Sequence, residues 1–351
     1  MGLTSTSFFV ALNVVCVLAV LGTLVFWGRI PGPSWVRWPA RLALILVCQF
    51  AAIAATATWI NNQYGLYASW NDLLGTDSFT DDASLPGVPA KKAKFTRSAN
   101  GVLSTQFRGS ASKLSGQVIV WTPPEYEQAK DKKKFPVILL LHGVPGGPQS
   151  YLEQGGIPDD FSDLVARGVT HPFVLVMPVV NPGNVNTDCS DVPGHKVATW
   201  LAKDVPDLVR THFRTLPDAK AWGVMGFSTG GYCAAKLPLQ YPDVFGAGAA
   251  LDPDPLDGEP DILPDKALRD RNTPTLLVRN SRADVGIFLA TSLQDRDSPR
   301  SAIDAFEKAA AGSSVKVKTL IRPTGGHNYQ TWTGMYPDAF GFLGSELRPP
   351  G

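Results

Sequence analysis

Two long apolar segments stand apart from the rest of this sequence. Residues 7–27 form a run of 21 without a charged side chain, and residues 42–60 form a second such run of 19. A helix rises about 1.5 Å per residue, so either run is long enough to cross a bilayer core of about 30 Å. The pattern predicts a transmembrane hairpin over residues 1–60. A cleaved signal peptide is the alternative for the first run, and a buried helix of the following domain is the alternative for the second.

After residue 95 the pattern changes to short apolar runs that alternate with helical segments. Continuous apolar strands are buried on both faces, which is typical of a mostly parallel sheet covered by helices. Residues 61–95 show little apolar periodicity and are interpreted as a linker, which leaves 96–351 as one α/β domain. The expected strands are 116–121, 136–141, 173–177, 222–225, 245–251, 275–278 and 315–321, and the expected helices are 198–213, 229–241 and 301–311.

Charge around the two apolar runs predicts an orientation. The loop between them, residues 28–41, carries three arginines and no acid. After the second run, in contrast, four aspartates come before the first lysine, Lys91. The positive-inside rule therefore places the short loop in the cytoplasm and the domain after residue 95 outside the cytoplasm. We expect the lipid bilayer to be a partner of this chain.

Overall charge excludes one class of partner. Lysine and arginine total 32 against 31 for aspartate and glutamate, so no net field favours nucleic acid. The acidic stretch 252–259 does not have the spacing of a calcium-binding loop and contains prolines. It is interpreted as a solvated turn, and no metal or cofactor is expected.

The motif Gly226-Phe227-Ser228-Thr229-Gly230 carries the most specific chemistry. It lies between the apolar strand 222–225 and the helix that begins near Thr229. A Gly-x-Ser-x-Gly sequence in this position forms a nucleophile elbow, a tight turn that exposes the serine at the end of the sheet. Ser228 is therefore the candidate nucleophile.

A serine nucleophile needs a histidine base and a carboxylate that orients it. His327 follows the last expected strand in a glycine-rich loop, with a simple surface histidine as the alternative reading. Asp284 follows the expected strand 275–278 and is the favoured acid. Ser228, Asp284 and His327 then follow the chain order of the α/β-hydrolases. Asp252 and Asp254 compete for the acid role because they follow the preceding strand.

An oxyanion hole requires two N–H donors. The backbone N–H of Thr229, directly after the nucleophile, is one candidate. The second is the N–H of Val144 in the turn after strand 136–141, because Pro145 has no N–H to give. His142, in the same turn, is expected to be structural.

Two of the four cysteines lie in the domain after residue 95. Cys189 belongs to a loop rich in Asn, Asp, Pro and Gly, and Cys233 lies five residues after Ser228. Outside the cytoplasm a disulfide between them would persist and would hold the loop beside the active site. Two unpaired buried thiols are the alternative.

Several of these motifs together resemble one branch of a known superfamily. They are residues 115–118, 123–126, Leu141-His142-Gly143, 226–231, and Gly326-His327 followed by Trp332. Over about residues 95–346 the chain resembles the esterase D-like branch of the α/β-hydrolases, which also includes the mycolyltransferases. The resemblance implies an acyl-enzyme mechanism on esters, with Ser228 as nucleophile and His327 as base. The acid of mycolyltransferases is a glutamate, and no glutamate lies between Glu259 and Glu307 here.

These observations favour a membrane-anchored, extracytoplasmic serine esterase acting on an acyl ester. An acyltransferase that passes the acyl group to a sugar or lipid hydroxyl shares the first half-reaction and is the second hypothesis. The third is a non-catalytic binding protein with a hydrolase fold, which the intact set of serine, histidine, acid and oxyanion turn disfavours.

Overall fold

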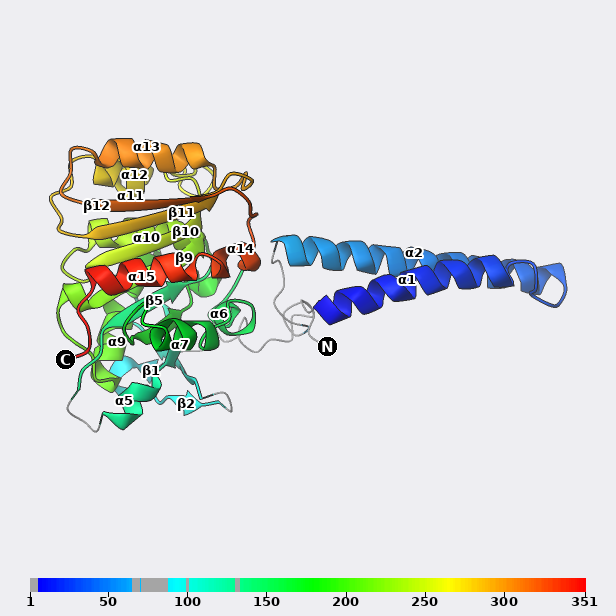
Figure 1. The fold of residues 1–351 in the computed structure, drawn as a ribbon, viewed down its shortest axis with the longest axis horizontal. Helices are drawn as coiled ribbons and strands as arrows, with labels where there is room; N and C mark the ends of the chain where they lie inside the picture. The colour runs from blue at the N-terminus through cyan, green and yellow to red at the C-terminus, as the bar shows by residue number, and fades with distance from the viewer. Residues whose placement is uncertain (1–5, 65–69, 71–87, 99–100, 130–132) are drawn as a thin grey trace. The chain divides into compact units, whose positions relative to one another are not determined.

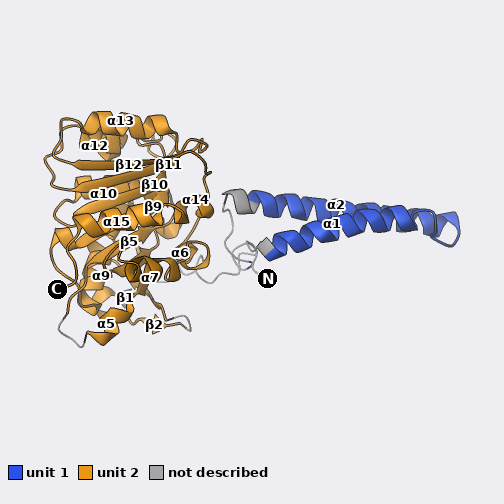
Figure 2. Ribbon diagram, in the orientation of Figure 1, with its two compact units in different colours: residues 1–76 blue, residues 77–351 orange. Residues whose placement is uncertain are grey.

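The computed structural model describes residues 6–64, 70, 88–98, 101–129 and 133–351, which belong to two compact units, 1–76 and 77–351 (Figures 1 and 2). Most of the expected linker, residues 65–69 and 71–87, lies outside the described residues. Its expected ends need correction. Helix α2 continues to Tyr64, and strand β1 (Val88–Pro89) is already paired with strand β3 of the sheet.

The first unit is a hairpin of two helices, α1 (Thr6–Phe26) and α2 (Ser34–Tyr64), which pack along each other (Figure 1). Arg41 closes the turn between them through two contacts with Trp27. Its Nε donates to the carbonyl of Trp27 at 3.2 Å, and its guanidinium carbon lies 5.1 Å from the centre of the indole ring of Trp27. Both helices contain a segment long and apolar enough to cross a membrane. These segments are Ser7–Phe26 and Ser34–Ile60.

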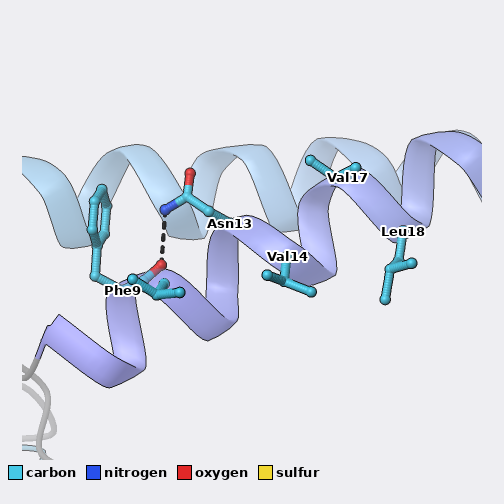
Figure 3. A pocket seen from close by; sticks show the side chains of 6 residues that line it. Phe9, Asn13, Val14, Val17 and Leu18 are labelled. Atoms are coloured by element: carbon cyan, nitrogen blue, oxygen red, sulfur yellow. Dashed lines mark hydrogen bonds between the residues drawn. The ribbon is translucent and has the colours of Figure 1, made fainter.

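A shallow pocket lies along α1 (Figure 3). Its lining residues are Phe9, Val10, Asn13, Val14, Val17 and Leu18. The one polar side chain, Asn13, donates from Nδ2 to the carbonyl of Phe9 at 2.8 Å. No nucleophile, acid or base lines this pocket, so we assign it to the apolar surface of the hairpin and not to a catalytic site.

The second unit is built on a twisted sheet with helices on both faces (Figure 1). The strands run in the order β1-β3-β4-β6-β5-β9-β10-β11-β12, and β2 pairs with β3 outside this path. All neighbours from β6 to β12 are parallel, whereas β3 and β4 are antiparallel additions. The remaining bounds are β2 (Thr96–Arg97), β3 (Leu103–Arg108), β4 (Ser115–Trp121), β5 (Val137–Leu141), β6 (Val174–Pro178), β9 (Trp222–Ser228), β10 (Ala247–Pro253), β11 (Gly286–Ser292) and β12 (Lys316–Arg322).

Strand β5 shows why the central strands are continuously apolar. Val137, Leu139 and Leu141 join one hydrophobic core, and Ile138 and Leu140 join the other. Successive side chains of a strand point to opposite faces, so a strand covered on both sides has no polar position. The first core also holds residues of α9 (Val205–His212), α10 (Thr229–Gln240) and α13 (Arg300–Ala310), and the second holds residues of α7 (Asp159–Ala166) and α15 (Tyr336–Glu346).

This architecture confirms the expected mostly parallel sheet, with one correction. Residues 275–278 are not a strand but part of helix α12 (Pro274–Val278), in which Pro274 occupies the first turn. A short apolar run fits either element, and a proline in this position favours a helix start. The strand next in the sheet is β11, which begins eight residues after Val278 and is buried along its whole length.

Candidate active site

Ser228 ends strand β9 and precedes helix α10, in the tight turn that the motif predicts. Its φ of +55° is in a region that residues with a side chain rarely adopt. The neighbouring glycines leave no room for a Cβ: one added at Gly226 would lie 2.2 Å from the carbonyl oxygen of Gly230, and one added at Gly230 would lie 2.0 Å from that of Leu141. The sequence therefore allows β5, β9 and α10 to approach closely enough to hold Ser228 in this strained conformation.

His327 is held by a carboxylate that the sequence analysis did not select. Its Nδ1 lies 2.9 Å from Oδ2 of Asp295, three residues beyond β11. The other oxygen of Asp295 accepts the backbone N–H groups of Asp297 at 2.8 Å and Ser298 at 3.0 Å. The Asp295 side chain is fully buried and that of His327 is 16% exposed. Asp295 thus orients the imidazole and is itself oriented by its own loop.

The electrostatics of this pair favour the ionic form of both groups. Burial opposes a charge on His327, but the hydrogen bond and charge of Asp295, with smaller effects of Asp252 and Asp254, outweigh it and raise the pKa of the imidazole. Burial likewise opposes the carboxylate, but the interactions with His327 and two backbone N–H groups lower the pKa of Asp295. A carboxylate in this state stabilises the imidazolium that forms when a serine gives up its proton.

Asp284 does not reach His327, and the prediction that it is the triad acid needs correction. It lies two residues before Gly286, the first residue of β11, and therefore at the amino end of the strand. Its exposed carboxylate forms an ion pair of 2.9 Å with Lys220, which precedes β9, and a hydrogen bond and charge from this lysine lower the pKa of Asp284. The error followed from the strand wrongly assigned to 275–278. Recognition of 286–292 as the strand would have pointed to Asp295.

The two competing aspartates lie at the carboxyl end of β10. Asp252 is fully buried, and burial together with the charge of Asp295 raises its pKa to about 7. Asp254 contacts the nucleophile directly: Ser228 Oγ donates to its Oδ1 at 3.1 Å, and Thr229 Oγ1 donates to its Oδ2 at 2.6 Å. Neither aspartate is the hydrogen-bonded partner of His327 Nδ1, and only Asp254 touches the serine.

The turn after β5 lies against the nucleophile. A Cβ added at Gly143 would be 3.1 Å from the Cβ of Ser228, which places the neighbouring residue, Val144, close to the elbow. Thr229 is buried as the first residue of α10. The positions of Val144 and Thr229 are thus compatible with an oxyanion hole.

His142 in this turn is structural, as the sequence analysis expects. Its Nε2 accepts the N–H of Val180 at 3.0 Å and its Nδ1 lies 2.7 Å from the carbonyl of Gly143. Burial lowers the pKa of His142 to about 4, so the ring is neutral and donates through Nδ1. It fixes the turn and does not act as a base.

Aromatic side chains line one side of the elbow. Phe227 stacks on Trp332 with ring centres 4.3 Å apart and planes at 8°, and it meets Tyr329 edge to face at 5.1 Å. Trp332 in turn packs against His327 with the two ring planes perpendicular and the ring centres 5.2 Å apart. Phe227 and Trp332 are both buried, at 1% and 4% exposed, so this stack belongs to the hydrophobic core behind the elbow and supports His327 from that side.

The loop that contains Cys189 is tied to the nucleophile helix at two points. Cys189 and Cys233 form a disulfide. One turn further along α10, the fully buried Lys236 donates from Nζ to the carbonyl of Asp188 and to Ser190 Oγ, the latter at 2.8 Å. Burial lowers the pKa of Lys236, whereas the nearby Asp188 carboxylate opposes this shift. The two ties restrain the loop beside the site.

Asp295, Asp297 and His327 place potential metal-ligand atoms within 4.8 Å of one another. His327 Nδ1 and both oxygens of Asp295 are already engaged in the hydrogen bonds described above. Their geometry is that of a histidine oriented by a carboxylate, so we assign them to acid–base chemistry and not to a metal centre.

The arrangement at this edge of the sheet is that of an α/β-hydrolase whose nucleophile is a serine. Within that superfamily the chain belongs to the putative esterase family, whose model matches residues 112–342. The match confirms the esterase resemblance that the sequence motifs indicate.

Solved structures show the same fold at low sequence identity. A ferulic acid esterase aligns over 70% of this chain and 97% of its own, with a TM-score of 0.60 and 22% identity. The S-formylglutathione hydrolase from Agrobacterium tumefaciens aligns over 73% and 99%, with a TM-score of 0.59 and 19% identity. The fluorophosphonate-binding serine hydrolase F of Staphylococcus aureus aligns over 69% and 98%, with a TM-score of 0.54 and 16% identity.

A curated relative matches over a shorter region. An uncharacterised protein of Corynebacterium glutamicum is 29% identical over 129 residues, which is 36% of this chain and 30% of that protein. The chain therefore spans less than a third of the length of this relative.

Proposed function

We propose that this protein is a membrane-anchored serine esterase that forms an acyl-enzyme on Ser228 and resolves it with water. The observation that carries the proposal is the elbow serine at the same sheet edge as the His327–Asp295 pair. Ser228 ends β9 and His327 follows β12, so both lie at the carboxyl edge of the parallel strands, where Asp295 also follows β11. Asp295 replaces Asp284 as the acid of the triad.

The reaction follows from these positions. Ser228 Oγ attacks the ester carbonyl carbon while its proton passes to His327 Nε2, and Asp295 holds the Nδ1–H and stabilises the imidazolium. The carbonyl oxygen becomes negative and is stabilised by the N–H groups of Thr229 and Val144. His327 then gives the proton to the departing alcohol. Water deprotonated by His327 attacks the acyl-serine, and the carboxylic acid leaves as Ser228 recovers its proton.

The apolar hairpin supports the location. Two helices long and apolar enough to span a bilayer are joined by a loop with three arginines and no acid. By the positive-inside rule this loop is cytoplasmic, and the catalytic unit lies on the other side of the membrane. A disulfide in the catalytic unit suits such a compartment.

Labelling of membranes with a fluorophosphonate probe tests the enzymatic part, because the probe reports an activated serine without a known substrate. The full-length protein should be labelled and should hydrolyse short p-nitrophenyl esters. Ser228→Ala should lose both. Ser345→Ala, a change to another serine of the catalytic unit, should lose neither. Labelling that persists in Ser228→Ala would refute the assignment.

A further inference from the structure

Asp254 is a carboxylate beside the nucleophile that the triad chemistry does not use. It accepts from Ser228 Oγ at 3.1 Å and from Thr229 Oγ1 at 2.6 Å, and its own N–H donates to the carbonyl of Ser228 at 3.2 Å. These three contacts fix the carboxylate relative to the atom that attacks the ester. The orienting partner of His327 is Asp295, so Asp254 is free for another role.

Burial raises the pKa of Asp254, which shows that a charge on this carboxylate is costly here. When the carboxylate is charged, it opposes the proposed reaction unless a group of the substrate compensates for that charge. The tetrahedral intermediate on Ser228 carries a negative oxygen, and a second negative charge a few ångströms away raises its energy. Among the described residues, no lysine or arginine lies within ion-pair distance of Asp254. His327 is the cationic group that acts on it, and that imidazole is occupied by catalysis.

Asp254 is also open to a ligand. It is only partly buried, as is Ser228, so each keeps some contact with solvent. Each carboxylate oxygen can accept more than the one hydrogen bond that it receives from the protein. Nearby acids, including Glu259, add negative charge around it.

The contact with Ser228 also has a consequence for the nucleophile. A hydroxyl has one proton, so while Ser228 donates to Asp254 it does not donate to His327. A substrate group that donates to Asp254 weakens its hold on the serine proton and releases Ser228 to the base. With a substrate that lacks such a group, the hydrogen bond from Ser228 to the Asp254 carboxylate has to break before catalysis, and no new hydrogen bond to that carboxylate replaces it.

We propose, on the basis of the function proposed above, that Asp254 is a specificity-determining residue that binds a hydrogen-bond donor of the substrate close to the scissile ester. The donor is a hydroxyl or an ammonium group, on the acyl chain or on the alcohol. Esters that carry a carboxylate close to the scissile bond are disfavoured, because the substrate carboxylate would face the Asp254 carboxylate with no hydrogen-bond donor between the two.

The test compares p-nitrophenyl esters that differ only in the acyl substituent: butyrate, 3-hydroxybutyrate, 3-aminobutyrate and hemisuccinate. For the full-length enzyme, kcat/KM should rise from hemisuccinate to butyrate to the two donor esters. The donor advantage should be about 10- to 100-fold, the equivalent of one hydrogen bond to a charged group. Butyrate esters of ethylene glycol and of n-propanol, followed by pH-stat titration, test a donor on the alcohol in the same way.

Asp254→Asn is the decisive variant because it keeps the shape of the side chain and removes its charge. The order of kcat/KM among the substrates should flatten to within about threefold, because the donor esters lose more than butyrate does and hemisuccinate is no longer disfavoured. Glu259→Gln removes a neighbouring charge that is not in contact with Ser228, and it should retain most of the preference.

The outcomes separate the two proposals. If the full-length enzyme is labelled and shows no donor preference in either series, the role of Asp254 is refuted and the esterase assignment stands. The same holds if Asp254→Asn lowers kcat/KM for all esters by one common factor, which indicates a structural role. If the enzyme is not labelled and hydrolyses none of the esters, both proposals fail.

Discussion

The imidazole of His327 and the carboxylate of Asp295 face each other across 2.9 Å, and they join the loops that follow the last two strands of the sheet. Neither loop has regular secondary structure at the contact. The position of the base therefore depends on Asp295, which two backbone N–H groups of its own loop hold in place.

Replacement of Asp295 by asparagine should reduce turnover of a p-nitrophenyl ester by about 10⁴-fold, because the favoured tautomer of His327 would no longer present a free Nε2 to Ser228. Asp284→Asn is the matched control. Asp284 is exposed and paired only with Lys220, so its removal should change turnover by less than about threefold. If Asp284→Asn loses most of its turnover and Asp295→Asn loses little, Asp284 is the acid after all and the role assigned to Asp295 is wrong.

The pH dependence of the reaction should reveal the charge on His327. The base must be neutral to accept the serine proton, so kcat/KM rises with pH as the imidazolium deprotonates. Its pKa is raised, chiefly because Asp295 outweighs the effect of burial, so the midpoint of the acid limb should lie above the ordinary value of about 6.5. In Asp295→Asn the midpoint should move to lower pH. An unchanged midpoint in that variant would contradict the assigned pair.

Some features of the site are determined locally in the sequence, and others depend on contacts between distant segments. The turn at Ser228 is determined by glycines at fixed spacing between a strand and a helix, and the sequence alone predicts it. The choice of Asp295 as the acid requires knowledge of which of two apolar runs becomes the strand that precedes it. The run 275–278 is short and begins with Pro274 in its first helical turn, whereas 286–292 is buried by neighbours distant in sequence. The contact between Ser228 and Asp254 joins two strand ends, and no spacing in the sequence predicts it.

The disulfide gives a prediction about stability. Cys189 and Cys233 are 44 residues apart, and a cross-link over such a loop reduces the entropy of the unfolded chain by an amount worth about 4 kcal/mol. The double replacement Cys189→Ala and Cys233→Ala should lower the free energy of unfolding by about 2–4 kcal/mol in denaturant titrations. Reduction of the wild type should give a similar loss, and the variant should not respond to reductant. Alkylation of both cysteines in the unreduced wild type would show that the bond does not form.

The orientation of the hairpin can be tested with single cysteines and a maleimide that does not cross membranes. One variant is Ser34→Cys, at the loop between the apolar helices. The other is Lys308→Cys, on an exposed face of the catalytic unit. The proposed orientation puts the loop, with its three arginines and no acid, in the cytoplasm, so Lys308→Cys should react in intact cells or spheroplasts and Ser34→Cys only after lysis. The parent protein, with Cys16 and Cys48 in the hairpin helices and the other two cysteines bonded, serves as the unlabelled control. The opposite pattern would place the catalytic unit in the cytoplasm. Labelling of both positions in intact cells would mean that neither is protected by a membrane, which would remove the argument for a spanning hairpin.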